Sequence, residues 1–322
     1  MLEKLLISHI TNDADLQPWI PYHQFGFRKA HSTTQQCHRI TDAIHKAFDD
    51  HRYCSALFLD ISQAFDKVWH PGVLYKIKRL LPLRYFQILR SYLHGRTYNT
   101  KFNSATSSPH PIRSGVPQGS ILGPLLYNLN MSDLPLSTHT ITSTFADDTA
   151  RVAVDSDPTS VSGLLQIHLN RIALWLHKWR IQVNRSKSTR ITFTTRNERC
   201  PSVCMNQQTI PQHTTVKYLG LHLDSKLTWR DHINTKRKQL DLKTRELYWL
   251  IGRKSPLSLA NKLLIYRTVL KPFWTYGMAL WRCASKTSIS IIQHYQSKLL
   301  RIINTTPWYV SNQTLHTDLR IL

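Results

Sequence analysis

Acidic residues are scarce in this chain. Its 322 residues include 19 aspartates and glutamates against 42 lysines and arginines, which gives a formal net charge of +23 and an isoelectric point near 10.1. A charge excess of this size implies a polyanionic partner, either a nucleic acid or an anionic membrane face. The basic residues are spread over the whole length rather than gathered in a terminal tail, so the pattern favours an extended binding groove.

Long apolar runs are also missing. No stretch reaches the roughly eighteen consecutive apolar residues of a membrane-spanning helix. The first residues contain the acidic Glu3 and no clean cleavage site, which is not the pattern of a secretory signal. The five cysteines are odd in number and widely separated, which is typical of free thiols in a reducing compartment. We therefore expect an intracellular protein, in the nucleus, the cytoplasm or both, that is neither secreted nor membrane-spanning.

What the chain does contain is a mixed first part and a helical last third. With 41% hydrophobic residues it can bury a sizeable core. Residues 56–60 read as a short buried strand, and 141–145 with 150–154 read as a hairpin. Helix-like spacing recurs after Ser32 and after Pro158. A second hairpin is expected over 216–224, followed by helices over about 231–250, 257–270 and 287–303, with Trp249, Trp274 and Trp281 in the core.

Three acidic residues carry the strongest chemical signal. Asp147 and Asp148 are adjacent at the expected hairpin turn, and Asp60 ends the buried strand. Neighbouring carboxylates repel unless a cation lies between them. Mg²⁺ prefers hard oxygen ligands, and two such ions about 4 Å apart are the usual catalysts of phosphoryl transfer to a nucleic acid. An Asp-Asp pair at a turn is common for conformational reasons alone, so the pair needs the surrounding motifs as support.

Those motifs occur in a defined order along about residues 20–230. They are Gln24-Phe25-Gly26-Phe27-Arg28 with His31-Ser32-Thr33; residues 57–68, which contain Asp60 and Phe65; Ser114-Gly115-Val116-Pro117-Gln118-Gly119-Ser120; Phe145-Ala146-Asp147-Asp148; Asn184 with Lys187; and Tyr218-Leu219-Gly220. In order and spacing the chain resembles the reverse transcriptases of non-LTR (LINE-type) retrotransposons, in particular the jockey type.

The resemblance implies a metal site. Asp60 and Asp147 would bind two Mg²⁺ ions, for which Mn²⁺ can substitute, and the backbone carbonyl of Ile61 would complete one coordination shell. Asp148 would lie at the edge of the site, either as a ligand or as a residue that holds the turn. Asp60, Asp147, Asp148 and Lys187 are thus the expected catalytic residues, with Lys187 donating a proton to the departing pyrophosphate or remaining a solvated loop lysine.

The resemblance also implies the substrate contacts. Phe65 would lie beneath the incoming sugar, where a bulky ring clashes with a 2′-hydroxyl, unless it is an ordinary core aromatic. Gln118 would touch the template or primer, and Gly119 would let the backbone approach the nascent base pair. Arg28 would grip the triphosphate.

The expected fold is α+β: a right-hand polymerase with an antiparallel palm sheet, flanking helices and an all-helical thumb. Partial fingers would occupy 1–53, the first palm motif 54–71, a fingers/palm insertion 72–113, the palm 114–225, and the thumb with a C-terminal extension 226–322. By comparison with complete elements of this type, we expect this chain to lack the endonuclease and part of the fingers.

The implied function is RNA-directed DNA synthesis from dNTPs on an RNA template with a DNA primer or target. The alternative is a catalytically inactive nucleic-acid-binding remnant. An RNA-directed RNA polymerase is disfavoured by Phe65 and by the match at residues 24–28. The oligomeric state does not follow from the sequence.

Overall fold

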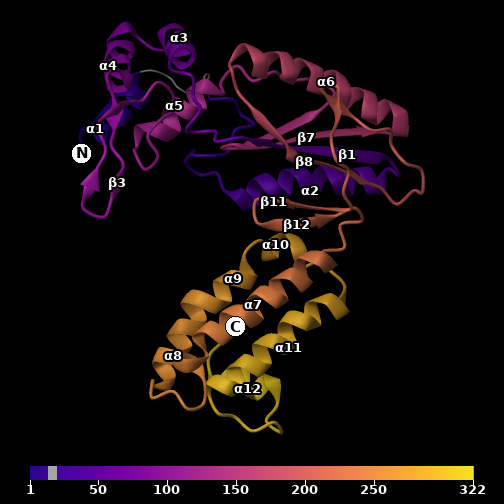
Figure 1. Ribbon diagram of the computed structural model, residues 1–322. Helices are drawn as coiled ribbons and strands as arrows, with labels where there is room; N and C mark the ends of the chain where they lie inside the picture. The colour runs from indigo at the N-terminus through magenta and orange to yellow at the C-terminus, as the bar shows by residue number, and fades with distance from the viewer. Residues whose placement is uncertain (14–19, 322) are drawn as a thin grey trace. The chain divides into compact units, whose positions relative to one another are not determined.

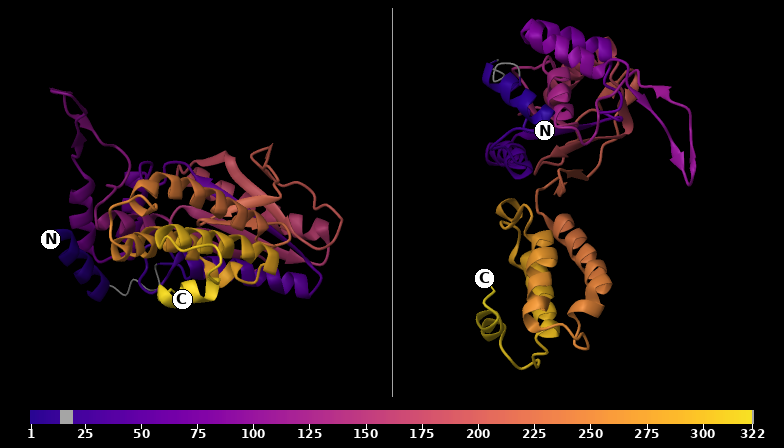
Figure 2. Two further views of the ribbon diagram at one scale, coloured as in Figure 1. Left: turned by 90° about the horizontal axis from the view of Figure 1, so that it is seen from below. Right: turned by 90° about the vertical axis from the view of Figure 1, so that its left-hand side faces the viewer.

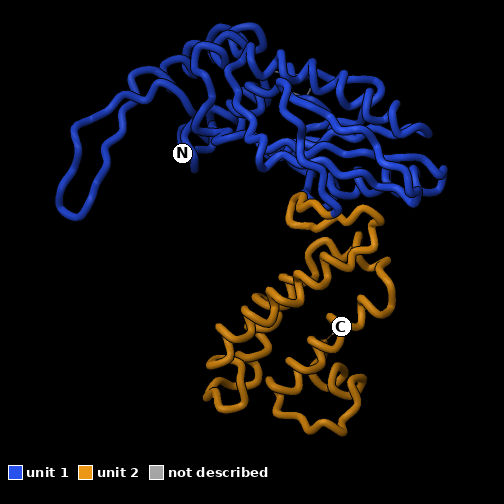
Figure 3. Tube along the Cα trace, turned by 45° about the vertical axis from the view of Figure 1, so that its right-hand side comes forward, with its two compact units in different colours: residues 1–214 blue, residues 215–322 orange. Residues whose placement is uncertain are grey.

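The computed structural model describes residues 1–13 and 20–321. The chain divides into two compact units, residues 1–214 and 215–322, which Figure 3 shows in different colours. The predicted limits of fingers, palm and thumb remain predictions. The structure groups the hairpin around Gly220 with the helical part of the chain.

Unit 1 is built on a four-stranded antiparallel sheet with the order β6-β7-β1-β8. Its strands are β1 (Tyr53–Ile61), β6 (Ile141–Phe145), β7 (Asp148–Asp155) and β8 (Val183–Phe193). Helix α6 (Pro158–Lys178) covers one face, and α2 (Thr33–Asp49) covers the other (Figure 1). Because both faces are covered, β1 is buried along almost its whole length.

The two covering helices begin at residues that satisfy their free backbone N–H groups. Ser32 and Gln35 form a reciprocal capping box at the start of α2. Asp157 accepts a hydrogen bond from the Ser160 N–H at the start of α6, and Pro158 occupies the first turn. The helices expected after Ser32 and after Pro158 are therefore confirmed.

Four further helices pack beside the sheet in unit 1. They are α1 (Leu2–Asp13), α3 (His70–Leu80), α4 (Leu83–Leu93) and α5 (Leu122–Asn130). Helix α5 is almost completely buried. The shorter strands of this unit are β2 (Thr97–Tyr98), β3 (Lys101–Phe102), β4 (Ala105–Thr106), β5 (His110–Pro111), β9 (Cys204–Met205) and β10 (Gln208–Thr209).

Unit 2 begins with the expected hairpin and continues as helices. Its elements are β11 (Thr215–Tyr218), β12 (Leu221–Asp224), α7 (Arg230–Ile251), α8 (Leu259–Ile265), a π-helix (Tyr266–Leu270), α9 (Lys271–Thr275), α10 (Met278–Trp281), α11 (Lys286–Ile303) and α12 (Asn312–Asp318). Trp274 and Trp281 are buried as expected. The prediction for Trp249 is wrong, because this side chain is 72% exposed. It lies nine residues after the buried Leu240, which at about 100° per residue is the opposite side of α7.

The expected α+β class is confirmed by the antiparallel sheet with flanking helices and by the helical last third. None of the described helices has the length and apolarity needed to cross a membrane. All five cysteines are free thiols.

Candidate active site

The hairpin that carries the acidic pair has a two-residue turn. Phe145 pairs with Asp148, so Ala146 and Asp147 form the turn between β6 and β7. Ala146 has a φ of 56°, an uncommon conformation for a residue with a Cβ atom, although the first central position of a tight hairpin turn requires it. Asp147 and Asp148 are exposed. The turn therefore presents two carboxylates to solvent at the end of the sheet.

Asp60 lies at the same edge of the sheet as this turn. Strand β1 pairs with β7 from Tyr53 opposite Asp155 to Leu59 opposite Thr149. Asp60 and Asp148 each lie directly beyond the last of these pairs, at the end where the hairpin turns. Antiparallel pairing thus brings together carboxylate residues that are distant in the sequence. Asp60 is half-buried.

A bulge in β8 brings the Asn184–Lys187 motif beside Asp60. Phe58 lies opposite Thr189, but Asp60 lies opposite Asn184, so the intervening residues of β8 have no counterpart on β1. The Asn184 Oδ1 atom accepts hydrogen bonds from the Ser186 hydroxyl (2.7 Å) and the Lys187 N–H (3.3 Å). Lys187 is therefore exposed on a bulge at the site edge.

The same bulge also holds the backbone of Asp60. The Ser188 hydroxyl donates to the Asn184 carbonyl at 2.8 Å and accepts a hydrogen bond from the Asp60 N–H at 3.2 Å. Ile61, the last residue of β1, is buried opposite Val183. The motif of residues 57–68 and the Asn184–Lys187 motif are thus joined by backbone pairing on one side of the expected site.

Gln24 fixes the hairpin turn from the other side. Its Oε1 atom accepts hydrogen bonds from the Ala146 N–H (3.0 Å) and the Gly26 N–H (2.8 Å), and its Nε2 atom donates to the Ala146 carbonyl (3.3 Å). The side chain is 2% exposed, so these bonds are shielded from water. Sequence reasoning missed this role, although Gln24 belongs to a motif that it had singled out.

Gly26 is required by the same contact. A Cβ atom on this residue would lie 2.2 Å from the Ala146 nitrogen, which is closer than two non-bonded atoms can approach. The Phe25 N–H donates to the Thr144 carbonyl at 2.9 Å, and the Thr144 N–H donates to the His23 carbonyl at 3.0 Å. The Gln24–Arg28 motif therefore adds a short extended segment to β6 and holds the turn in its strained conformation.

Phe65 lies in a stack of aromatic rings close to the acidic turn. It is half-buried and stacks on Tyr127 of α5 at a centroid distance of 4.7 Å and an interplanar angle of 16°. Phe27 contacts it edge-on at 5.7 Å. Burial raises the pKa of Tyr127, and the charges of Asp147 and Asp148 raise it further. Tyr127 thus stacks on the Phe65 ring and also lies close enough to the two carboxylates for their charges to act on its hydroxyl group.

The remaining expected contacts lie in two loops. The Gln118 amide donates to the Asp66 carboxylate at 2.8 Å, and Gly115, whose φ is 91°, has no room for a Cβ atom beside the Asp66 carbonyl. Gly119 is exposed with a φ of 85° and open space around it. One Arg28 nitrogen donates to the carbonyls of its own loop, at Pro21 and Gln24, both at 3.3 Å.

The donor chemistry at this edge fits divalent cations. Carboxylate and carbonyl oxygens are the ligands that Mg²⁺ prefers, and Asp60, Ile61, Asp147 and Asp148 supply them at adjoining strand ends. Within residues 1–13 and 20–321, no three His, Cys, Asp or Glu side chains are arranged as one metal-holding group. The fold therefore brings the donor residues to one edge without assembling their side chains into a finished metal site.

An antiparallel sheet with aspartates from two neighbouring segments at one edge, and helices on both faces, is the palm of a right-hand polymerase. Residues 1–223 match the family model "Reverse transcriptase (RNA-dependent DNA polymerase)". The chain belongs to this family, whose members use divalent metal ions.

Two curated relatives come from mobile elements of Drosophila melanogaster. The chain is 41% identical over 326 residues to "Probable RNA-directed DNA polymerase from transposon X-element". It is 37% identical over 331 residues to "RNA-directed DNA polymerase from mobile element jockey". Each alignment covers 100% of this chain and 36% of the relative, so the chain spans about a third of the relatives' length.

Among solved structures, a telomerase from Candida tropicalis aligns over 98% of this chain and 56% of its own, with a TM-score of 0.49 and 9% identity. This likeness is too distant to bear on function.

Proposed function

We propose that the chain is the polymerase part of a non-LTR retrotransposon protein and copies RNA into DNA. RNA would be the template, DNA the primer and target, and dNTPs the substrates. The observation that carries the proposal is that Asp60 and the turn of Asp147 and Asp148 lie at the same edge of the sheet. These substrates belong inside the cell, so we propose that the protein acts in the nucleus, the cytoplasm or both.

Two divalent ions, Mg²⁺ or in its place Mn²⁺, would be held by the Asp60, Asp147 and Asp148 carboxylates and the Ile61 carbonyl. When bound, such ions activate the primer 3′-hydroxyl and neutralise charge on the leaving pyrophosphate. Asp147 and Asp148 are exposed and so are accessible to hydrated cations and phosphates. The chain's contribution at this point is to hold the donor residues at fixed backbone positions, through the Gln24 bonds and the β8 bulge.

In the reaction, the primer 3′-hydroxyl gives up its proton to water, a bond forms between its oxygen and the α-phosphorus of the dNTP, and the bond from that phosphorus to pyrophosphate breaks. Lys187 would donate a proton to the pyrophosphate, since it lies exposed on the bulge beside Asp60. Arg28 would bind the triphosphate through its guanidinium group. Gln118 and Gly119 are exposed on the loop before α5, which is hydrogen-bonded to Asp66, and would contact the nascent pair.

The test is primer extension by the 322-residue chain on an RNA template with Mg²⁺. We expect the wild type to incorporate deoxynucleotides and Asp147→Asn to abolish incorporation, because the amide removes the negative charge that holds a cation. A matched control is Asp155→Asn, which changes an aspartate at the opposite end of β7 and should retain activity.

Two outcomes would contradict the proposal. If soluble wild-type protein binds RNA but incorporates nothing, the chain is the inactive remnant. If Asp147→Asn and Asp155→Asn retain equal activity, the catalytic centre lies elsewhere.

A further inference from the structure

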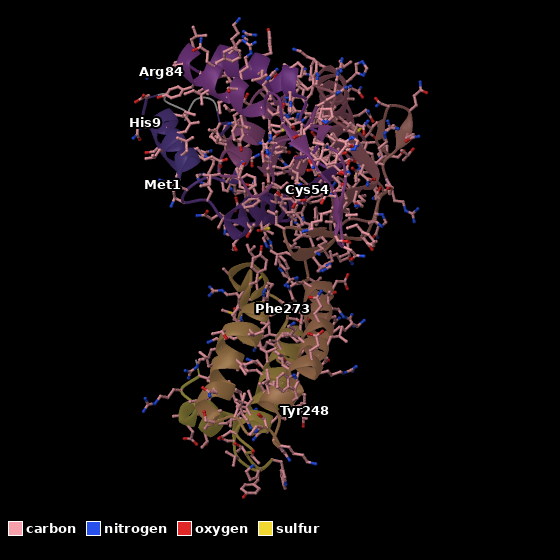
Figure 4. The ribbon with its side chains drawn as sticks, turned by 60° about the vertical axis from the view of Figure 1, so that its left-hand side comes forward. Met1, His9, Cys54, Arg84, Tyr248 and Phe273 are labelled. Carbon is pink, nitrogen blue, oxygen red and sulfur yellow. The ribbon has the colours of Figure 1, made fainter. Side chains whose placement is uncertain are left out.

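The segment that follows Asp66 and runs through α5 carries no negative charge. From residue 67 to residue 132 the sequence has no aspartate or glutamate, yet it has nine lysines and arginines. Two of these cations are neutralised by acids from outside the segment: Lys76 pairs with Asp133 at 2.6 Å, and Arg84, which lies at the periphery of α4 in Figure 4, pairs with Asp13 at 2.8 Å. The remainder leave this part of unit 1 strongly positive.

Within this segment, residues 96–113 form a two-stranded arm. Its strands β2 and β5 pair near the base, and β3 and β4 pair near the tip. Figure 2 shows the arm standing away from the helices of unit 1 in both views. Almost all of its residues are exposed. A free hairpin of this kind buries little apolar surface and is marginally stable alone, so a partner that covers it would stabilise it.

The exposed side chains of the arm indicate what that partner is. Phe102 is 77% exposed and Tyr98 is 52% exposed. Lys101 adjoins Phe102, and Arg96 and Arg113 lie at the base. In the part of the chain that the structure describes, no ion pair involves these three cations. Positive charge combined with open aromatic rings suits a nucleic acid strand whose phosphates and base faces are both accessible. A duplex hides its base faces in the stack, so the arm fits a single strand.

The base of the arm leads directly into the loop that holds Gln118. A hollow of about 370 Å³ lies at this junction and is lined by residues of both parts, including Arg96, Asp66 and Gln118. Gln118, which we expect to contact the nascent base pair, and Arg96, the first cation of the arm, thus border the same hollow. A strand that leaves the pair on this side would pass from the hollow to the arm.

We propose that the arm binds the unpaired part of the template RNA ahead of the active site. This inference rests on the proposed polymerase function, because only a template that is being copied has an unpaired strand at this position.

The test measures binding without synthesis. The 322-residue chain is titrated, with no dNTPs, against two labelled hybrids of one DNA primer on RNA, whose unpaired 5′ RNA overhang is either a single nucleotide or about twelve, within the usual site sizes for single strands. The ratio of the two dissociation constants isolates the contribution of the overhang. The variant is Lys101→Ala with Phe102→Ala. A matched control is Arg171→Ala with Leu174→Ala, which removes one exposed cation and one exposed apolar group from α6.

We expect the wild type and the control to prefer the long overhang, and the arm variant to lose about tenfold of that preference, the size of one lost stacking contact with one lost phosphate contact. The melting temperature should not change, because neither side chain is buried. If the arm variant had the wild-type ratio of dissociation constants, or lost affinity equally for both hybrids, the proposal would be overturned. The arm would then bind another partner, such as a protein. Failure of the polymerase function would instead appear as wild-type protein that shows the ratio but does not extend the primer when dNTPs are added.

Discussion

At the scale of single residues, Phe65 provides the sharpest test of substrate choice. Its ring is held by Tyr127 on one face and by Phe27 at its edge, so it cannot turn aside without breaking both contacts. Replacing it with valine removes the ring but keeps an apolar side chain. We expect Phe65→Val to incorporate ribonucleotides at least tenfold more readily relative to deoxynucleotides, since a clash with the 2′-hydroxyl costs more than about 1.4 kcal/mol when space is lacking.

The measurement is the ratio of kcat/KM for a dNTP and the matching rNTP. Phe86→Val, at another half-buried phenylalanine, on α4, controls for general loosening of unit 1. An unchanged sugar preference in Phe65→Val would show that the ring is only a packing residue.

Some of these residues could be assigned from the sequence and others could not. Asp147 and Asp148 were apparent because paired acids at a turn in a basic chain are conspicuous. The hydrogen bonds of Gln24 to Ala146 were not, because the two residues are 122 positions apart and a glutamine gives no local sign of its partner. The juxtaposition of Asp60 and Asn184 likewise depends on a register shift that only tertiary pairing reveals.

At the scale of elements, the contact between the Gly26 segment and the β6–β7 turn is tested by Gly26→Ala. The added methyl group would lie 2.2 Å from the Ala146 nitrogen, so one of the two segments must move. We expect a loss of about 1–3 kcal/mol in the free energy of unfolding and a larger relative loss of primer extension, because the displaced segment carries Asp147. Denaturant unfolding and extension rates measure the two effects.

Gly163→Ala is the matched control for this substitution. Gly163 lies in α6 with nothing within 4 Å of an added Cβ atom, so alanine should stabilise the helix by up to about 1 kcal/mol. If Gly26→Ala behaved like Gly163→Ala, the close approach to the turn would be refuted.

His23, in the same segment, should make the free energy of unfolding depend on pH. Burial, together with the charges of Arg151 and Arg39, lowers the pKa of His23 to about 3, whereas the unfolded chain has a value near 6.5. Below pH 6.5 the unfolded state therefore binds a proton that the folded state does not. The free energy of unfolding should fall as the pH drops from 6.5 toward 3, by about 2 kcal/mol at pH 5, and this contribution should be constant above pH 6.5.

Unfolding of the wild type and of His23→Gln across this range measures the effect. The glutamine side chain of the variant cannot take up the proton in either state, so its curve should be flatter by the stated amount. Parallel curves for the two proteins would show that His23 titrates normally in the folded chain.

Element prediction succeeded where periodicity was strong and failed where polar residues form strands. The helices after Ser32 and Pro158 follow a regular apolar spacing, whereas β8 was not predicted. Its buried Arg190 is hydrogen-bonded to the hydroxyls of Ser55 and Ser162, so a charged residue occupies a core position that a sequence pattern assigns to an apolar one. The arm was missed because a hairpin without a buried face has no alternation to detect.

At the scale of the whole molecule, the positive charge is shared by both units. Residues 215–322 contain eighteen lysines and arginines against five acidic residues, and the first 214 residues contain twenty-four against fourteen. The overall composition was sufficient to predict a nucleic-acid partner. It could not predict which surfaces carry the charge, because cations such as Lys76 are buried among aromatic rings and cannot reach a phosphate.

Salt dependence of binding follows from this distribution. If six to ten phosphates are contacted, affinity for an RNA–DNA hybrid should fall about 10³- to 10⁵-fold between roughly 50 and 200 mM salt. Lys238 and Arg245 are exposed on α7, and changing both to glutamine should make the negative slope of log K against log [salt] shallower by about 1.4–1.8. Lys46→Gln, which removes a cation paired with Asp42 on α2, should leave the slope nearly unchanged. Equal slopes for all three proteins would mean that α7 does not contact the hybrid, and that the charge of the helical unit serves a different polyanion.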